Sequence, residues 1–292
     1  MTISEKFGTF CSNLRMSGAT VNAVSYRYHR IIHQLNKDFY NSDNDSWHGL
    51  YVGSYGRGTA IDTSDIDMLF VLPYEVYKQY NSYLGNGQSA LLQAVRSSLQ
   101  KTYPSSYIKG DGQVIVVSFT DGITFEIVPC FENTDNSFTF PDSNNGGSWK
   151  TTNPRPEINA INTLNNNTNK NLKRLCRMIR AWKEEHDVPM GGLLVDTFAY
   201  NFLKDWGYKN NSFTYYDWMT RDFFQYLSNV DDGQSYWKAV GSGQFIWRRG
   251  PFAKKALKAY NNAIEALVYE DKNMQYSANN KWREIYGTRF PC

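Results

Sequence analysis

The spacing of hydrophobic residues predicts a long helix near the start of the chain. Between residues 3 and 39 the apolar positions recur three and four residues apart, as an amphipathic helix requires. They form one continuous stripe, made of Val21, Val24, Tyr28, Ile31, Ile32, Leu35 and Phe39. The polar run 41–46 ends this pattern, and the same spacing returns at residues 88–102. We therefore expect residues 3–39 to be helical and a further helix over 88–102.

Short apolar runs between and after these helices predict strands. The runs cover residues 48–53, 65–72, 113–119 and 123–130. Pro73 stops the second run, and the pair Asp121-Gly122 between the last two is typical of a two-residue hairpin turn. The first half of the chain is thus expected to form a mixed sheet with flanking helices.

The second half has a different pattern. Residues 132–170 are rich in Asn, Ser, Thr, Gly and Pro, which favours loops with one short helix after Pro156. Helices are expected at 172–186, 192–206, 218–227, 251–271 and 282–286. We predict an α+β fold in two domains: residues 1–150 with the sheet, and residues 151–292 as a helical lobe. The N-terminal helix, over 20–39, is expected to join them.

The bulk composition changes this picture little. The chain has 292 residues, 41% of them hydrophobic, and a formal net charge of +3, which is too mild to indicate a long nucleic-acid partner. Its 4 cysteines form no C-x-x-C pair, which argues against a structural zinc site or a disulfide framework. No apolar run has the roughly 20 residues of a membrane span and no signal peptide is visible, so we expect a cytoplasmic protein without a membrane partner.

Two acids two residues apart are the most informative chemistry in the sequence. Asp65 and Asp67 lie on a predicted strand, so both side chains point to one face while Ile66 and Met68 point to the core. Like charges placed so close favour a cation between them. Paired carboxylates can bind two divalent ions about 3.5–4 Å apart, the spacing of two-metal phosphoryl chemistry. Oxygen ligands suit Mg²⁺, with Mn²⁺ as the alternative.

Two further features complete the predicted site. Glu126 is the only charge in the run 123–129, so it is the candidate third carboxylate, and an edge-strand glutamate facing water is the alternative. Gly53 and Ser54 follow a predicted strand, where backbone N–H groups and a hydroxyl can bind phosphate oxygens. Such a turn is a weak signal alone and gains weight from the acids that follow it.

Basic residues are candidates for binding the phosphates. On the predicted helix 172–186, Arg180 and Lys183 share a face, and they are expected to contact a nucleoside triphosphate. A solvated basic face is an equal alternative. The complete basic set is Arg57, Lys150, Lys173, Arg174, Arg177, Arg180 and Lys183.

These motifs resemble a known family. Gly53-Ser54, Thr59, the run from Ser64 to Asp67 and Glu126 are similar to the polymerase-β-like nucleotidyltransferases. Residues 169–183, 191–198 and 280–291, the last with Trp282-Arg283 and Phe290-Pro291, resemble the bacterial cGAS/DncV-like nucleotidyltransferases (CD-NTases). The likeness covers nearly the whole chain. It departs from the family where relatives often carry Lys in place of Arg180 and Asp in place of Glu126.

The resemblance implies an enzyme with a polymerase-β-like core. The implied activity is synthesis of a cyclic di- or trinucleotide second messenger from nucleoside triphosphates, in anti-phage (CBASS) signalling, with two Mg²⁺ ions and a downstream effector that binds the product. A linear oligonucleotide synthase or RNA-tailing nucleotidyltransferase is the alternative. The base, the ring size, the activating signal and the oligomeric state do not follow from the sequence.

Overall fold

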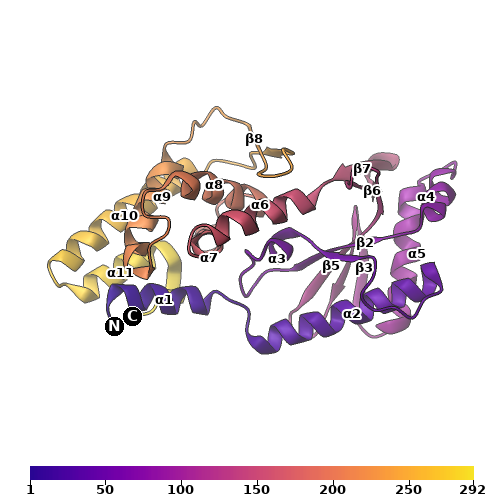
Figure 1. Cartoon of the computed structure of the whole chain (residues 1–292), viewed down its shortest axis with the longest axis horizontal. Coiled ribbons are helices and arrows are strands. Elements are labelled where there is room, and N and C mark those ends of the chain that lie inside the picture. Colours follow the sequence, from indigo (N-terminus) through magenta and orange to yellow (C-terminus); the bar gives the residue numbers. More distant parts are fainter. The chain divides into compact units, whose positions relative to one another are not determined.

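The chain folds into two compact units that do not follow the predicted division. The computed structural model describes all 292 residues (Figure 1). A helical unit contains residues 1–16, 57–62 and 156–292, and a sheet unit contains residues 17–56 and 63–155. The units therefore differ from the predicted domains at three places: residues 1–16 and 57–62 belong to the helical unit, and residues 151–155 belong to the sheet unit.

The sheet unit is built on a mixed sheet of seven strands. Its central path is β1-β2-β5-β4-β3, with β6 pairing β5 and β7 pairing β6. β2 and β5 run parallel, and the other pairs are antiparallel. The bounds are β1 Gly49–Tyr51, β2 Ile66–Val71, β3 Tyr107–Asp111, β4 Val114–Ser118, β5 Thr124–Glu132, β6 Phe138–Asp142 and β7 Ser148–Thr152. The predicted mixed sheet is confirmed, including the turn at Gly122, which has φ +86°.

Most of residues 3–39 are helical as predicted, but the continuous apolar pattern is divided between two helices. α1 (Ile3–Asn13) ends before a break, and α2 (Gly18–Tyr40) begins after Ser17. The Ser17 side chain accepts a hydrogen bond from the backbone N–H of Thr20, which caps the first turn of α2. α2 is the longest helix of the sheet unit. The other helices that start in this unit are α3 (Gly53–Arg57), α4 (Tyr74–Asn81) and α5 (Gly87–Thr102).

Residues 132–170 contain more regular structure than their composition predicts. β6 and β7 form a hairpin there, and α6 (Pro154–Asn166) follows. The turn uses Asn145, Gly146 and Gly147, all with positive φ, which Gly and Asn adopt at low cost. β7 is largely polar and exposed, so it has no hydrophobic alternation that would have revealed it.

The helical unit packs its helices around an aromatic core. Trp182, Trp282 and Tyr286 are at most 1% exposed, and the edges of Trp282 and Phe290 lie against Phe7 of α1. Its further elements are α7 Asn171–Glu185, α8 Gly192–Asp205, α9 Tyr216–Ser228, α10 Ala253–Asp271, α11 Gln275–Tyr286 and a hairpin of β8 (Tyr236–Lys238) and β9 (Phe245–Trp247). The final helix is thus longer than the predicted 282–286.

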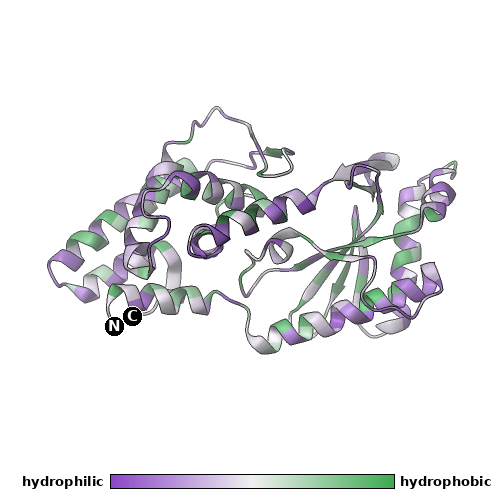
Figure 2. Cartoon of the chain, in the orientation of Figure 1, coloured by the Kyte–Doolittle hydropathy of each residue, from purple (hydrophilic) through white to green (hydrophobic).

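Hydropathy follows this architecture along the chain. Figure 2 shows largely hydrophobic strands in the sheet, whereas the helices carry mixed hydrophobic and hydrophilic positions. None of the helices combines the length and the apolar character that crossing a membrane would need.

The raised pKa values of Asp217 and Glu270, two acids of the helical unit, predict that stability falls as the pH rises. Burial raises the pKa of Asp217 to about 6 and that of Glu270 to about 7. The folded state therefore favours their protonated forms, and this contribution is complete below their ordinary values of 3.8 and 4.5. It is lost as the pH rises through about 6 and about 7.

We expect the thermal unfolding midpoint to be lower at about pH 8 than at about pH 5. The double variant Asp217→Asn, Glu270→Gln should remove most of this difference, while Asp205→Asn, whose side chain is 79% exposed, should keep it. Calorimetry across the pH range measures the effect. An unchanged slope in the double variant would contradict the assignment.

Candidate active site

Strand pairing places two of the predicted acids side by side in the sheet unit. In the parallel pair of β2 and β5, Asp67 is in register with Glu126. Neighbours in register on adjacent strands point to the same face of a sheet. Ile66 and Met68 are 1% and 0% exposed, so the predicted alternation along β2 is confirmed. β5 is an inner strand between β2 and β4, so the edge-strand alternative for Glu126 is wrong.

The third predicted acid, Asp65, lies just before β2. It is an exposed residue two positions from Asp67, and its charge acts on Glu126, which groups it with the other two acids. Burial raises its pKa. Burial also raises the pKa of Glu126, and the neighbouring carboxylates of Asp67 and Asp65 raise it further. The three acids therefore repel one another electrostatically, and positive charge at this face would stabilise them.

The Gly-Ser turn is shaped around one of these carboxylates. Gly53, the first residue of α3, has φ +58°, and a Cβ atom there would overlap the Asp67 carboxylate. The backbone N–H of Val52 also donates to the carbonyl oxygen of Asp67, at 3.0 Å. Glycine at position 53 is thus required twice, by its backbone conformation and by the approach of Asp67.

The donor chemistry of this face fits a hard divalent cation. Asp65, Asp67 and Glu126 offer only carboxylate oxygens, which Mg²⁺ and Mn²⁺ prefer. The cradle at Gly53, which a Cβ would fill, leaves room for the Asp67 carboxylate. The structure itself arranges no group of three or more His, Cys, Asp or Glu side chains as a metal site. The metal therefore stays a prediction that rests on the donor set.

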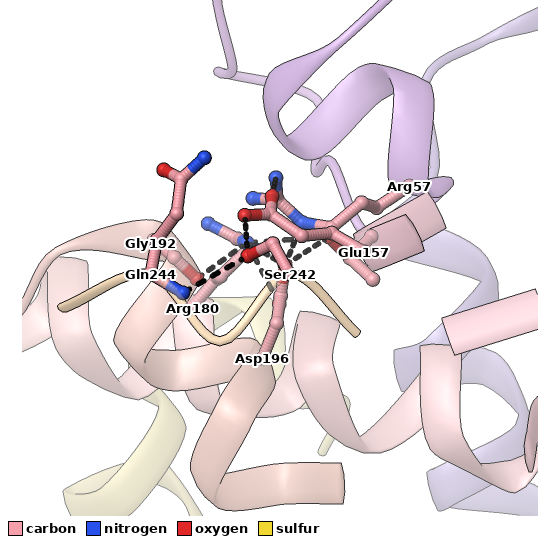
Figure 3. A network of polar contacts seen from close by, with 8 residues as sticks. Arg57, Glu157, Arg180, Gly192, Asp196, Ser242 and Gln244 are labelled. Carbon is pink, nitrogen blue, oxygen red and sulfur yellow. Dashed lines mark hydrogen bonds and ion pairs between the residues drawn. The ribbon is translucent and has the colours of Figure 1, made fainter. Parts of the chain in front are cut away.

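The two predicted phosphate contacts have different surroundings in the helical unit. Arg180 is 8% exposed, and its guanidinium donates to both carboxylate oxygens of Asp196 at 2.8 Å and to the Gly192 carbonyl at 3.0 Å (Figure 3). Lys183, one turn later on α7, is half-buried. The hydrogen bonds of Arg180 thus lie within the helical unit. They correspond neither to the predicted phosphate contact nor to a solvated basic face.

Two acidic residues that are candidates for a functional role were not predicted from the sequence. Asp196 is completely buried on α8, and Glu157 on α6 is 4% exposed. Both lie within hydrogen-bonding or ion-pair distance of Arg57, at 2.8 Å and 3.6 Å. The signal was present for Asp196, which interrupts the apolar run 193–199 just as Glu126 interrupts its own.

Comparison with known proteins identifies the family of the chain. Residues 1–165 match the family model described as the Second Messenger Oligonucleotide or Dinucleotide Synthetase (SMODS) domain. Over 176 residues the chain is 23% identical to the "Probable cyclic nucleotide synthase IK1_05630" of Bacillus cereus (strain VD146). This match covers 57% of the chain and 51% of that protein, so the chain spans about half the length of the curated relative it matches.

Solved structures share the fold over nearly the whole chain. The structure of E. coli MS115-1 CdnC with ATP superposes with a TM-score of 0.74 at 15% identity, covering 99% of this chain and 98% of that one. The Bradyrhizobium diazoefficiens CD-NTase CdnG in complex with GTP gives 0.68 at 10% identity, covering 99% and 96%. At such identities the likeness shows the fold, and the predicted fold class is confirmed.

The contact between Gly53 and Asp67 predicts a severe effect of adding one methyl group. Gly53→Ala should lower the unfolding midpoint and displace the Asp67 carboxylate, because the substitution meets both a left-handed backbone and an occupied space. The backbone term alone costs about 1–2 kcal/mol. Gly122→Ala is the matched control, since Gly122 has φ +86° but nothing within 4 Å of the added carbon.

Thermal denaturation of the two variants separates the cost of the backbone conformation from the cost of the overlap with Asp67. The unfolding midpoint should fall further in Gly53→Ala than in Gly122→Ala, and a crystal structure of Gly53→Ala should show a displaced Asp67 carboxylate. Equal losses would mean that Asp67 does not constrain position 53.

Proposed function

We propose that this chain, which belongs to the Second Messenger Oligonucleotide or Dinucleotide Synthetase family, joins nucleoside triphosphates into a cyclic oligonucleotide. The observation that carries the proposal is the register of Asp67 with Glu126 on parallel strands, with Asp65 two residues before Asp67. This family membership and the named relative support the class of product. The acids support the class of reaction, which is nucleotidyl transfer.

Magnesium is the cation we propose for this site, with manganese as a substitute. Asp65, Asp67 and Glu126 would bind the cation, and two such ions would be bound when both substrates are present. When bound, such ions neutralise phosphate charge and lower the pKa of an attacking hydroxyl. Burial raises the pKa of Glu126, and the neighbouring carboxylates of Asp67 and Asp65 raise it further, which supports a cationic ligand at this face.

The reaction that we propose transfers a nucleotidyl group. A ribose hydroxyl of the acceptor nucleotide attacks the α-phosphorus of a donor triphosphate. A new P–O ester bond forms, the bond from the α-phosphorus to the bridging oxygen breaks, pyrophosphate leaves, and the hydroxyl proton passes to solvent. Ring closure repeats the step between the free hydroxyl and the triphosphate of the linear intermediate. Two such bonds release two pyrophosphates for a dinucleotide, and a trinucleotide needs one more.

The remaining predicted contacts would orient the triphosphate. Gly53 allows close approach of the backbone, and Ser54 adds a hydroxyl beside it. Lys183 supplies a half-buried ammonium group on α7. For Arg180, the two bonds to Asp196 support a role within the helical unit in preference to the predicted triphosphate contact.

The cellular role follows from the family by extension. We propose that the product is a signal in antiviral defence, read by a downstream effector, and that the reaction takes place in the cytoplasm without a long nucleic-acid substrate. The structures of related proteins determined with ATP and with GTP support nucleotide substrates of this kind.

Replacing one carboxylate tests the reaction class. Asp67→Asn should reduce pyrophosphate release from nucleoside triphosphates with Mg²⁺ by at least about 100-fold, because charge needed in the transition state is removed. Asp43→Asn, on an acid whose side chain is 86% exposed, should leave the rate unchanged. Both variants should unfold at the wild-type temperature. A wild-type rate in Asp67→Asn would contradict the site.

The product distinguishes ring synthesis from linear polymerisation. We expect a product that resists phosphatase, because a ring carries no terminal phosphate. Thin-layer chromatography of labelled products before and after phosphatase, with mass spectrometry of incubations with single and paired nucleotides, measures this and identifies the bases. A ladder of phosphatase-sensitive products would favour the linear or RNA-tailing alternative.

A further inference from the structure

The middle of the proposed active-site motif belongs to the helical unit. Gly53–Gly56 and Asp65–Asp67 lie in the sheet unit, but residues 57–62 between them are part of the helical unit. We call residues 57–62 the connector. Because the chain is continuous, the connector begins at the last residue of α3 and leads to the start of β2.

The connector is held by side chains of α7 and by the C-terminal segment. Arg177 donates to two of its carbonyl oxygens, those of Gly58 at 2.7 Å and Ala60 at 3.1 Å. Arg289 pairs with Asp62 at 3.5 Å. The basic face of α7 therefore binds the connector's backbone, which explains part of the positive charge in this helix.

Asp196 is the centre of the attachment. Its carboxylate accepts from Arg57 Nε at 2.8 Å, from the Thr59 hydroxyl at 2.8 Å and from Arg180 at 2.8 Å. Burial alone would raise the pKa of Asp196, but Arg180 and Arg57 hold it below its usual value. A fully buried carboxylate is tolerated only with such partners, so the connector has one strongly preferred position.

A second set of contacts connects Arg57 to the β8–β9 hairpin through Glu157. Glu157 lies 3.6 Å from Arg57, and its other oxygen accepts from the Ser242 hydroxyl at 2.7 Å (Figure 3). The hairpin turn is itself fitted to α6, because Gly241 has φ +83° and an added Cβ would overlap the Pro156 carbonyl. Arg57, the last residue of α3, thus pairs with α8 through Asp196 and with α6 through Glu157, and Glu157 in turn binds the hairpin turn through Ser242.

We propose that Arg57, Asp196, Glu157 and Ser242 are positioning residues, which set the Gly53–Ser54 turn and the Asp65–Asp67 carboxylates in their reactive arrangement. None of them needs to touch the nucleotide. Their effect passes through the connector to both ends of the motif, and this part of the inference rests on the proposed function. A small displacement of the groups that hold a substrate weakens its binding and orientation.

Two variants of graded severity test the inference in the full chain. Arg57→Lys keeps a positive charge beside Asp196 but loses the planar fork that joins two acids. Ser242→Ala removes only the hydroxyl that binds Glu157. Leu227→Ala is the control, because Leu227 is 0% exposed in the same unit and lies on α9, outside the network.

Hydrogen exchange measures positioning without relying on catalysis. Amides of residues 53–60 should exchange at least about tenfold faster in Arg57→Lys, and less so in Ser242→Ala, while amides of β5 keep wild-type protection. In Leu227→Ala, residues 53–60 should stay protected despite a comparable or larger fall in the unfolding midpoint. Unchanged exchange in Arg57→Lys, or equal loosening in the control, would overturn the inference.

Kinetics then connect positioning to nucleotide binding. Below the unfolding transition, Arg57→Lys should raise KM for the nucleoside triphosphate about tenfold with a smaller change in kcat, and Leu227→Ala should leave KM unchanged. A wild-type KM in Arg57→Lys would contradict the positioning role. If the wild-type protein released no pyrophosphate, the proposed function would fail, while the exchange experiment would still decide whether these residues hold the connector.

Discussion

The parallel pairing of β2 with β5 is the constraint on which the candidate site depends. It sets Asp67 and Glu126 opposite each other on inner strands, where burial and repulsion both raise the pKa of Glu126. Backbone hydrogen bonds between the two strands fix this register, so the two residues stay neighbours despite the repulsion. The surrounding hydrophobic residues, such as Phe125 and Ile127, make the strands stable enough to hold them.

The Gly-Ser turn and the connector extend this constraint in two directions. Gly53 lets the chain turn against the Asp67 carboxylate, which only a residue without Cβ allows. The connector then leaves the sheet unit and returns at Thr63, held on the way by Arg177 and Asp196. A motif that is continuous in the sequence is therefore divided between two structural units.

Periodicity predicted the elements that bury one regular face and missed those that do not. The inner strands β2, β4 and β5 and the helices α5, α8 and α10 lie close to their predicted positions because their apolar residues follow the period of the backbone. The strands β3 and β7 expose most of their side chains, so no alternation of hydrophobic and polar residues marks them. The break before α2 depends on the cap at Ser17, a local interaction that the continuous stripe concealed.

The sequence predicted part of the site because an acid within an apolar run needs a positively charged or hydrogen-bonding partner. Glu126 and Asp196 carry this same signal, and the structure resolves it in opposite ways. Asp196 receives two arginines from the chain, and its pKa falls. Glu126 has acids as its strongest charged neighbours, and its pKa rises. The first is a complete internal ion pair and holds the fold together. The second leaves electrostatic energy that a cationic ligand can recover. Pattern alone cannot separate these outcomes, because the deciding charges come from residues more than a hundred positions away in the case of Arg57 and Asp196.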